Sequence, residues 1–283
     1  MRAPAIARAV DGNWPEQVLA PGDPPSRAEP AREDILQVTG LHAGYGAGDI
    51  LKGIDVSVPH GGVVTVIGPN GCGKSTMLKT VTGLLKARQG DIRLAGKSLV
   101  DLTPSSRVRA GLAYVPQEYN VFRNLTVLEN LLIAQEFMTG KRRRGKAPIS
   151  DELVALFPEL PGKFKTLAGN LSGGQRQMVA FACALAGEPK VLLLDEPSAG
   201  LSPKYMLDIF AAVRRVNESG VSVFMVEQNA IEALRISDTC IVMANGRVKL
   251  TASAEQVLEM DDLHSLYLGD AREGPGHGSP DRL

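Results

Sequence analysis

Two patterns of apolar residues succeed each other along the chain. In residues 35–38 and 54–58 apolar and polar positions alternate, which predicts half-buried strands. Residues 63–67 and 191–194 are apolar almost throughout, as is typical of strands buried in a parallel sheet. Helix-favouring segments separate these strands. The sequence therefore predicts an α/β fold with a parallel sheet.

The same patterns predict the remaining elements. We expect the first strand to turn at Gly40, and residues 89–102 to form a small antiparallel sheet. Further strands are predicted at 111–115, 221–226 and 239–242, and helices at 74–85, 125–157 with an interruption at 139–146, 174–186, 204–217 and 230–236.

The length of 283 residues suits one α/β unit with an added subdomain. Residues 1–33 hold six of the 18 prolines and show no apolar period, which predicts a disordered tail. Residues 270–283 are polar and predict a second tail. The folded part is therefore expected at 34–269, with a helical subdomain at about 118–187.

Composition narrows the function classes. Thirty-one basic residues balance 31 acidic ones, so the net charge gives no reason to expect a nucleic-acid partner. Three scattered cysteines suggest a reducing compartment. The longest apolar runs fall short of the roughly 18 residues that a membrane span needs, so we expect a protein without spans of its own.

A glycine-rich loop follows the strand at 63–67. Its spacing, Gly68-x4-Gly73-Lys74-Ser75, is that of a phosphate-binding loop between a strand and a helix. Backbone N–H groups and the helix N-terminus can surround an anion, with Lys74 on the β- and γ-phosphates and Ser75 on Mg²⁺. The predicted nucleotide-binding residues are Gly68, Pro69, Asn70, Gly71, Cys72, Gly73, Lys74, Ser75 and Thr76. Near a helix N-terminus the Cys72 thiolate is also expected to be favoured.

Two carboxylates end the apolar run at 191–194. Asp195 is expected to position Mg²⁺ beside Ser75. Glu196 follows directly and is expected to point another way, since successive side chains of a strand alternate in direction. It suits the role of the base that activates water.

A second anion-binding turn is predicted at residues 171–177, here called the signature turn. Ser172, Gly173, Gly174 and Gln175 open a helix there, although the serine could simply cap that helix. The turn lies shortly before Asp195 and follows an apparently helical insertion. In this arrangement residues 34–269 resemble the ATP-binding cassette (ABC) proteins.

The resemblance implies ATP and Mg²⁺ as ligands and a head-to-tail pair of cassettes. Each ATP would lie between the phosphate loop of one cassette and the signature turn of the other. Gln117 matches the glutamine that senses the γ-phosphate and the metal, and Tyr45 matches the aromatic residue that stacks on adenine. Residues 198–202 match the loop that crosses between cassettes, although the usual aspartate is absent.

One position departs from the family. Gln228 stands where most cassettes carry a histidine that contacts the γ-phosphate. Glutamine keeps an N–H donor, so Gln228 is a candidate for a donor to the phosphate. Alternatively, residues 227–229 only cap the next helix, with Asn229 as the cap. The Glu227-Gln228-Asn229 string, like residues 120–127 and 267–269, is similar to an ATPase subunit of branched-chain amino-acid importers.

The resemblance predicts the ATP-hydrolysing subunit of an importer at the cytoplasmic face of the inner membrane. Its expected partners are a second ATPase subunit, identical or different, two membrane permeases and a solute-binding protein. Relatives in that subgroup serve urea and short amides as well. A soluble ABC-type ATPase of DNA repair or translation is the alternative, whereas a P-loop kinase or GTPase would leave the signature turn unexplained.

Overall fold

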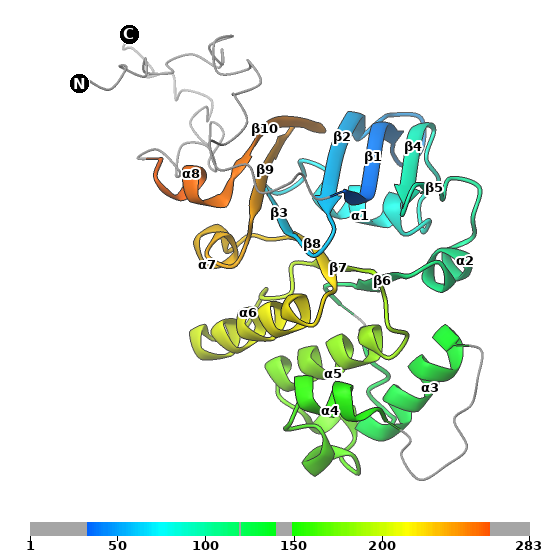
Figure 1. Cartoon of the computed structure of the whole chain (residues 1–283), viewed down its shortest axis with the longest axis vertical. Helices are drawn as coiled ribbons and strands as arrows, with labels where there is room; N and C mark the ends of the chain where they lie inside the picture. The colour runs from blue at the N-terminus through cyan, green and yellow to red at the C-terminus, as the bar shows by residue number, and fades with distance from the viewer. Residues whose placement is uncertain (1–32, 119, 140–148, 261–283) are drawn as a thin grey trace, which may run out of the picture.

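The computed structural model describes residues 33–118, 120–139 and 149–260. Two sheets and a group of helices make up this part of the chain (Figure 1). The predicted tail at 1–33 up to residue 32, the predicted tail at 270–283, the predicted interruption at 139–146 beyond its first residue, and residues 267–269 lie outside the described residues. Within the described ranges, no helix combines the length and apolar character needed to cross a bilayer.

The larger sheet has six strands in the order β10-β9-β3-β8-β7-β6. All neighbours pair in parallel except β10, which is antiparallel to β9. The expected run of apolar strands is therefore confirmed, and every residue of β3, β7 and β8 is buried. The strands are β3 (Val63–Ile67), β6 (Leu112–Val115), β7 (Val191–Asp195), β8 (Ser222–Val226), β9 (Thr239–Ala244) and β10 (Arg247–Ser253).

The smaller sheet is antiparallel and has the order β2-β1-β4-β5. The turn predicted at Gly40 is wrong, because β1 continues through this residue. Gly40 sits in an irregularity of the β1–β2 register, with φ at +55°, and its N–H donates to Asp55 Oδ1 at 2.7 Å. A bulge thus absorbs the glycine without ending the strand. The strands are β1 (Asp34–Ala43), β2 (Leu51–Pro59), β4 (Gln89–Leu94) and β5 (Lys97–Ser98).

The helix after the phosphate loop ends one turn earlier than predicted. α1 (Lys74–Val81) stops before Gly83, whose φ is +80°. The buried guanidinium of Arg107 donates to Thr80 O at 2.9 Å and Val81 O at 2.8 Å. It thereby satisfies carbonyl groups that the helix end leaves without an intrahelical partner. Arg107 belongs to α2 (Pro104–Arg109), a helix that the apolar pattern did not predict.

A separate group of helices lies beyond the β6–β7 edge of the large sheet (Figure 1). It contains α3, α4 and α5, and α5 joins it to the sheet because Val179 and Phe181 share one apolar core with Leu192 and Leu194 of β7. The elements are α3 (Val127–Thr139), α4 (Asp151–Leu156), the 3₁₀ turns η2 (Pro161–Lys163) and η3 (Ala168–Asn170), and α5 (Gly173–Leu185).

The remaining helices follow β7, β8 and β10. The sequence predicted the first two but not the third, nor strand β10. They are α6 (Pro203–Glu218), α7 (Ala230–Leu234) and α8 (Ala254–Leu258).

Candidate functional site

The predicted phosphate loop joins the end of β3 to the start of α1. Gly68, Gly71 and Gly73 have φ values of +152°, +80° and +109°, which favour glycine. Close approach adds a second requirement at two of them. A Cβ on Gly68 would lie 2.1 Å from Met243 O, and one on Gly73 would lie 2.9 Å from a methyl carbon of Leu51.

Lys74 is buried at the first position of α1. Its Nζ donates to Gly68 O at 2.8 Å and Pro69 O at 3.3 Å, and lies 4.0 Å from Glu196 Oε1. Both of these hydrogen bonds of the Lys74 ammonium therefore go to neutral carbonyl groups. A buried cation beside a helix N-terminus fits the phosphate groups of ATP.

Ser75 and Asp195 meet as predicted, from opposite ends of a 120-residue stretch. Ser75 Oγ donates to Asp195 Oδ1 at 2.9 Å. The hydroxyl and the carboxylate are oxygen ligands of the kind that Mg²⁺ takes beside phosphates. This donor set fits the metal that the loop motif implies.

Tyr114 is a member of this group that the sequence did not identify. Its hydroxyl donates to Asp195 Oδ2 at 3.0 Å. Burial and the adjacent Asp195 carboxylate raise the pKa of Tyr114, so the hydroxyl keeps its proton. Tyr114 lies near the end of the strand that precedes Pro116, and β6 pairs with β7 in parallel. Its position near the carboxyl end of a strand, where side chains of a parallel sheet meet at one edge, is the feature of the sequence that could have identified Tyr114.

Glu196 lies just beyond the end of β7. Its φ of +46° turns the backbone, so the alternation expected for successive strand residues does not apply. Glu196 Oε2 accepts from Gln117 Nε2 at 3.3 Å while its other oxygen faces Lys74. Glu196 therefore lies beside the phosphate loop, and its partners differ from those of Asp195, which are Ser75 and Tyr114.

Gln228 follows β8 at the same edge of the sheet, because Val226 pairs with both Val66 and Asp195. The neighbouring Asn229 occupies the N-cap position of α7 but makes no side-chain cap bond there. Its amide instead donates to Ser198 Oγ at 2.6 Å. The interpretation of Asn229 as a side-chain cap is therefore wrong.

The signature turn begins α5. Ser172 Oγ accepts from Gln175 N at 3.3 Å, and Gln175 Oε1 accepts from Ser172 N at 3.2 Å, which together form a capping box. A Cβ on Gly174 would lie 2.6 Å from the ring of Tyr205, so α6 requires glycine at this position. The cap that the sequence allowed is present.

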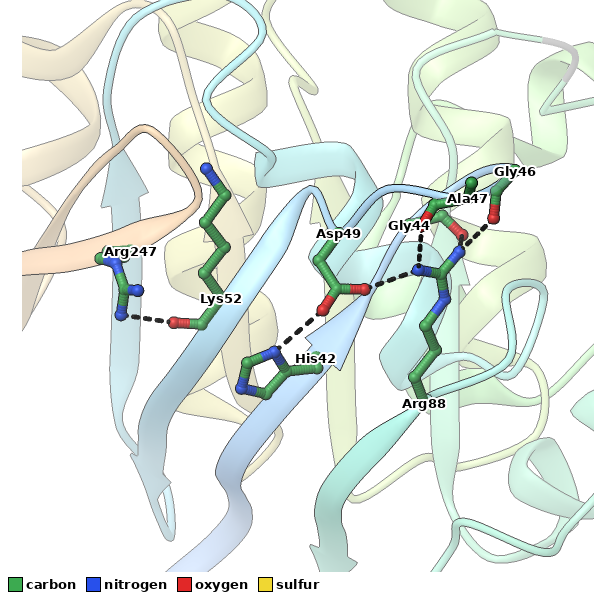
Figure 2. Close-up of polar contacts among 8 residues, drawn as sticks. All are labelled: His42, Gly44, Gly46, Ala47, Asp49, Lys52, Arg88 and Arg247. Atoms are coloured by element: carbon green, nitrogen blue, oxygen red, sulfur yellow. Dashed lines mark hydrogen bonds and ion pairs between the residues drawn. The ribbon is translucent and has the colours of Figure 1, made fainter.

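Tyr45 lies in the β1–β2 connection and is exposed, as an aromatic residue that stacks on a base must be. Arg88 holds this connection from the start of β4: it donates to Gly44 O, Gly46 O and Ala47 O, and to Asp49 Oδ1 at 2.7 Å (Figure 2). His42 Nδ1 donates to Asp49 Oδ2 at 3.1 Å. These two bonds hold the pKa of Asp49 below its usual value.

Cys72 does not behave as expected from its place near a helix N-terminus. The side chain is buried, and burial raises the pKa of the thiol despite the nearby Lys74 charge. The expectation of a favoured thiolate is therefore wrong, because desolvation exceeds the attraction of the positive charges.

A cavity of about 450 Å³ lies beside Glu196 and contains none of residues 68–76 in its lining. Its lining includes the predicted sensor glutamine, Gln117, and Gly173 of the signature turn. Two further lining residues bond to each other, as Asn120 Nδ2 donates to Gln177 Oε1 at 2.6 Å. Glu196 and Gly200 also line it.

Comparison with known sequences gives one consistent family. A family model described as ABC transporter matches residues 51–199. The probable branched-chain amino acid transport ATP-binding protein LivF of Archaeoglobus fulgidus is 39% identical over 236 residues, which are 83% of this chain and 99% of that protein. The high-affinity branched-chain amino acid transport ATP-binding protein BraG of Pseudomonas aeruginosa is 40% identical over 225 residues, 80% of this chain and 95% of that protein.

A lower similarity extends to other transport systems. The lipopolysaccharide export system ATP-binding protein LptB of Haemophilus influenzae is 34% identical over 239 residues, 83% of this chain and 98% of that protein.

Solved structures agree with the fold. An ATP-binding cassette of an ABC transporter in its ADP conformation has a TM-score of 0.71 and 30% identity, covering 84% of this chain and all of that one. A dimeric cassette in a post-hydrolysis state, bound to ADP and Pi, has a TM-score of 0.67 and 26% identity, covering 77% of this chain and 98% of that one.

Proposed function

The chain belongs to the ABC transporter family and is an ATP-hydrolysing subunit of such a transporter, and from this premise we propose that it drives the import of branched-chain amino acids or related small solutes. The similarity to LivF and BraG, over at least 95% of each, carries the proposal. The transported solute needs a direct test because LptB, which belongs to a lipopolysaccharide export system, is also 34% identical to this chain.

The geometry supports a specific way of holding ATP. Backbone N–H groups of the phosphate loop and Lys74 bind the β- and γ-phosphates, and Tyr45 stacks on adenine. Ser75, Asp195 and Gln117 would hold Mg²⁺, which would neutralise charge on the phosphate oxygens. Tyr114 keeps Asp195 oriented through its hydroxyl.

Glu196 is the proposed general base. Its carboxylate lies 4.0 Å from Lys74 Nζ and accepts from Gln117, which places it between the phosphate loop and the cavity. In this position it can accept a proton from a water molecule that attacks the γ-phosphate. Gln228 would donate a hydrogen bond to the charge that develops on the phosphate.

A second cassette completes the proposed site. Ser172, Gly173, Gly174 and Gln175 would close on the γ-phosphate held by the partner, and the partner could be identical or different. The dimeric cassette bound to ADP and Pi supports such pairing. Hydrolysis would then require both chains.

Two permeases and a solute-binding protein are the further partners that we propose. The side chains of Phe122, which precedes α3, and of Ile133 and Phe137, which belong to α3, are exposed apolar groups. An exposed apolar group of this kind suits docking on a membrane protein. The subunit would thus work at the cytoplasmic face of the inner membrane.

Co-purification from detergent-solubilised membranes tests this function. The full chain should bring down two membrane permeases, and the recovered complex should hydrolyse ATP faster when its solute-binding protein and leucine, isoleucine or valine are added. Stimulation by urea or acetamide alone would redirect the cargo. Recovery without a membrane partner would favour a soluble ATPase of DNA repair or translation.

A further inference from the structure

Glu227 is a buried carboxylate to which the proposed reaction assigns no role. It directly follows β8, and its side chain is 0% exposed. A buried carboxylate is costly unless hydrogen bonds stabilise it. Its partners therefore indicate what it does.

Those partners lie on two different loops. Glu227 Oε1 accepts from Ser198 N at 2.9 Å, in the loop that follows Glu196. Glu227 Oε2 accepts from Gln228 N at 2.8 Å and from Asn229 N at 3.2 Å. One carboxylate thus connects the loop after β7 with the loop after β8.

A second contact repeats this connection. Asn229 Nδ2 donates to Ser198 Oγ at 2.6 Å, and Ser198 is 1% exposed. The backbone adds a third contact, from Glu196 N to Val226 O at 2.9 Å. Three contacts that converge over so few residues hold the two loops in one arrangement.

The loop after β7 needs such support because Glu196 has a left-handed backbone. A non-glycine residue at a φ of +46° persists where the surrounding structure holds it. The bond from Ser198 N to Glu227 lies two residues from this point. Burial raises the pKa of Glu227, while its hydrogen bonds with Ser198, Asn229 and Gln228 act in the opposite direction. Both of its oxygens accept from backbone N–H groups, which an amide with a single oxygen could not do.

We infer that Glu227 is a positioning residue that joins the loop of Glu196 to the loop of Gln228, so that the proposed base and the proposed donor keep their places relative to the phosphate loop. This inference rests on the proposed hydrolytic role of Glu196. It goes beyond that role because it concerns how Glu196 and Gln228 are held in place: the carboxylate of Glu227 accepts from the backbone of both loops.

The variant Glu227→Gln tests the inference in the full chain. The amide keeps the volume, but its NH₂ group faces an N–H donor in place of an acceptor. We expect kcat for MgATP to fall about 10- to 100-fold, as for a misplaced catalytic group. KM should stay within roughly threefold, because the groups that bind phosphate are unchanged. Amide hydrogen exchange should rise in residues 196–202 and 227–229 but not in 68–76.

Thr65→Val is the matched control. Thr65 is 0% exposed in β3 of the same sheet, and its Oγ1 lies 2.6 Å from Ser237 Oγ. This variant loses a buried polar pair without touching either loop. It should lower the melting temperature while kcat stays near that of the wild type.

A gentler variant guards against loss of folding. Asn229 is exposed, so Asn229→Ala removes only the contact to Ser198 Oγ and should lower kcat in the same direction. Adding Ser198→Ala to Asn229→Ala should lower kcat little further, because both substitutions remove the same hydrogen bond.

The outcomes separate this inference from the proposed function. The positioning role would be overturned if Glu227→Gln kept the kcat of the wild type or left amide exchange in the two loops unchanged. It would also be overturned if Thr65→Val, measured below both melting temperatures, lost as much kcat as Glu227→Gln. Hydrolysis that Glu196→Gln leaves intact would instead remove Glu196 as the base, and recovery of the chain without a membrane partner would overturn the proposed function.

Discussion

Two helices of this chain begin at glycine-containing turns suited to anions, but their N-termini differ. α1 begins after Gly73 without any side-chain cap, and its first residue is the buried Lys74. α5 begins after Ser172, and a capping box with Gln175 already occupies part of its backbone donors. The N-terminus of α1 therefore has no side-chain cap, whereas the N-terminus of α5 is capped by side chains.

This contrast assigns different tasks to the two turns. The phosphate loop combines uncapped N–H groups, a helix N-terminus and a cation, so it can bind phosphate within one chain. In the signature turn, Ser172 and Gln175 of the same chain already cap the helix. Gly174 is required there by its packing against Tyr205. Under the proposed function, a second cassette would bring a phosphate to this turn. A glycine-containing turn before a helix identifies a candidate anion site. Whether side chains already cap that helix then indicates whether one chain alone can bind the anion there.

The largest difference between the two turns should appear in nucleotide binding by the isolated chain. Lys74→Ala should weaken ATP binding by at least about 10²-fold, because the buried cation is lost. Ser172→Ala should leave binding unchanged and lower the free energy of unfolding by about 0.5–2 kcal/mol through loss of the cap. Equilibrium binding of a fluorescent ATP analogue and thermal melting measure both effects. Equal loss of binding in the two variants would contradict the division of tasks.

Hydrolysis should depend on Glu196 without a loss of binding. Glu196→Gln keeps the bond to Gln117 possible but cannot accept a proton, so turnover should fall about 10²–10⁴-fold. ATP should still bind at the phosphate loop and hold two cassettes together, as size-exclusion chromatography with MgATP would show. Near-normal hydrolysis would place the base elsewhere.

Gln228 should contribute a smaller but distinct effect. Gln228→Ala should reduce turnover by about 10²–10³-fold if its amide donates to the developing charge. Gln228→His keeps a donor, so it should retain activity and add a pH dependence between about 6 and 7. ATPase rates of the assembled transporter as a function of pH check both. A loss of only a few-fold in the alanine variant would remove Gln228 from the site.

The smallest expected effect concerns the thiol in the phosphate loop. Because burial raises the pKa of Cys72, its thiolate should be scarce at neutral pH and should increase as the pH rises towards that higher pKa. Modification by maleimide, followed by mass spectrometry, should therefore be slow at pH 7 and faster at pH 9, with Cys72→Ala as the control. Rapid modification at pH 7 would show that the helix N-terminus outweighs burial. Burial also raises the pKa of Cys183 and of Cys240 to about 12, so neither should react first.

Local features were predictable because neighbouring residues determine them. The loop from Gly68 to Ser75 follows from its own spacing, and the carboxylate of Asp195 follows from the apolar strand before it. Their meeting was also predictable, since both lie at carboxyl ends of parallel strands. Strand β10 was missed because none of its residues is fully buried, and α8 was missed because it is only five residues long, too short for a helical apolar period to show.

The sequence by itself determined the α/β order, the phosphate loop, the paired carboxylates and the signature turn, because each depends on residues within about one element of each other. Only the tertiary structure decided that Tyr114 orients Asp195, that Arg88 holds the loop of Tyr45, and that Glu227 joins the loops of Glu196 and Gln228. The partners in these bonds lie between 29 and 81 residues apart. No local pattern encodes such a bond, because it forms only when the packing of a sheet brings together segments that are distant in the sequence.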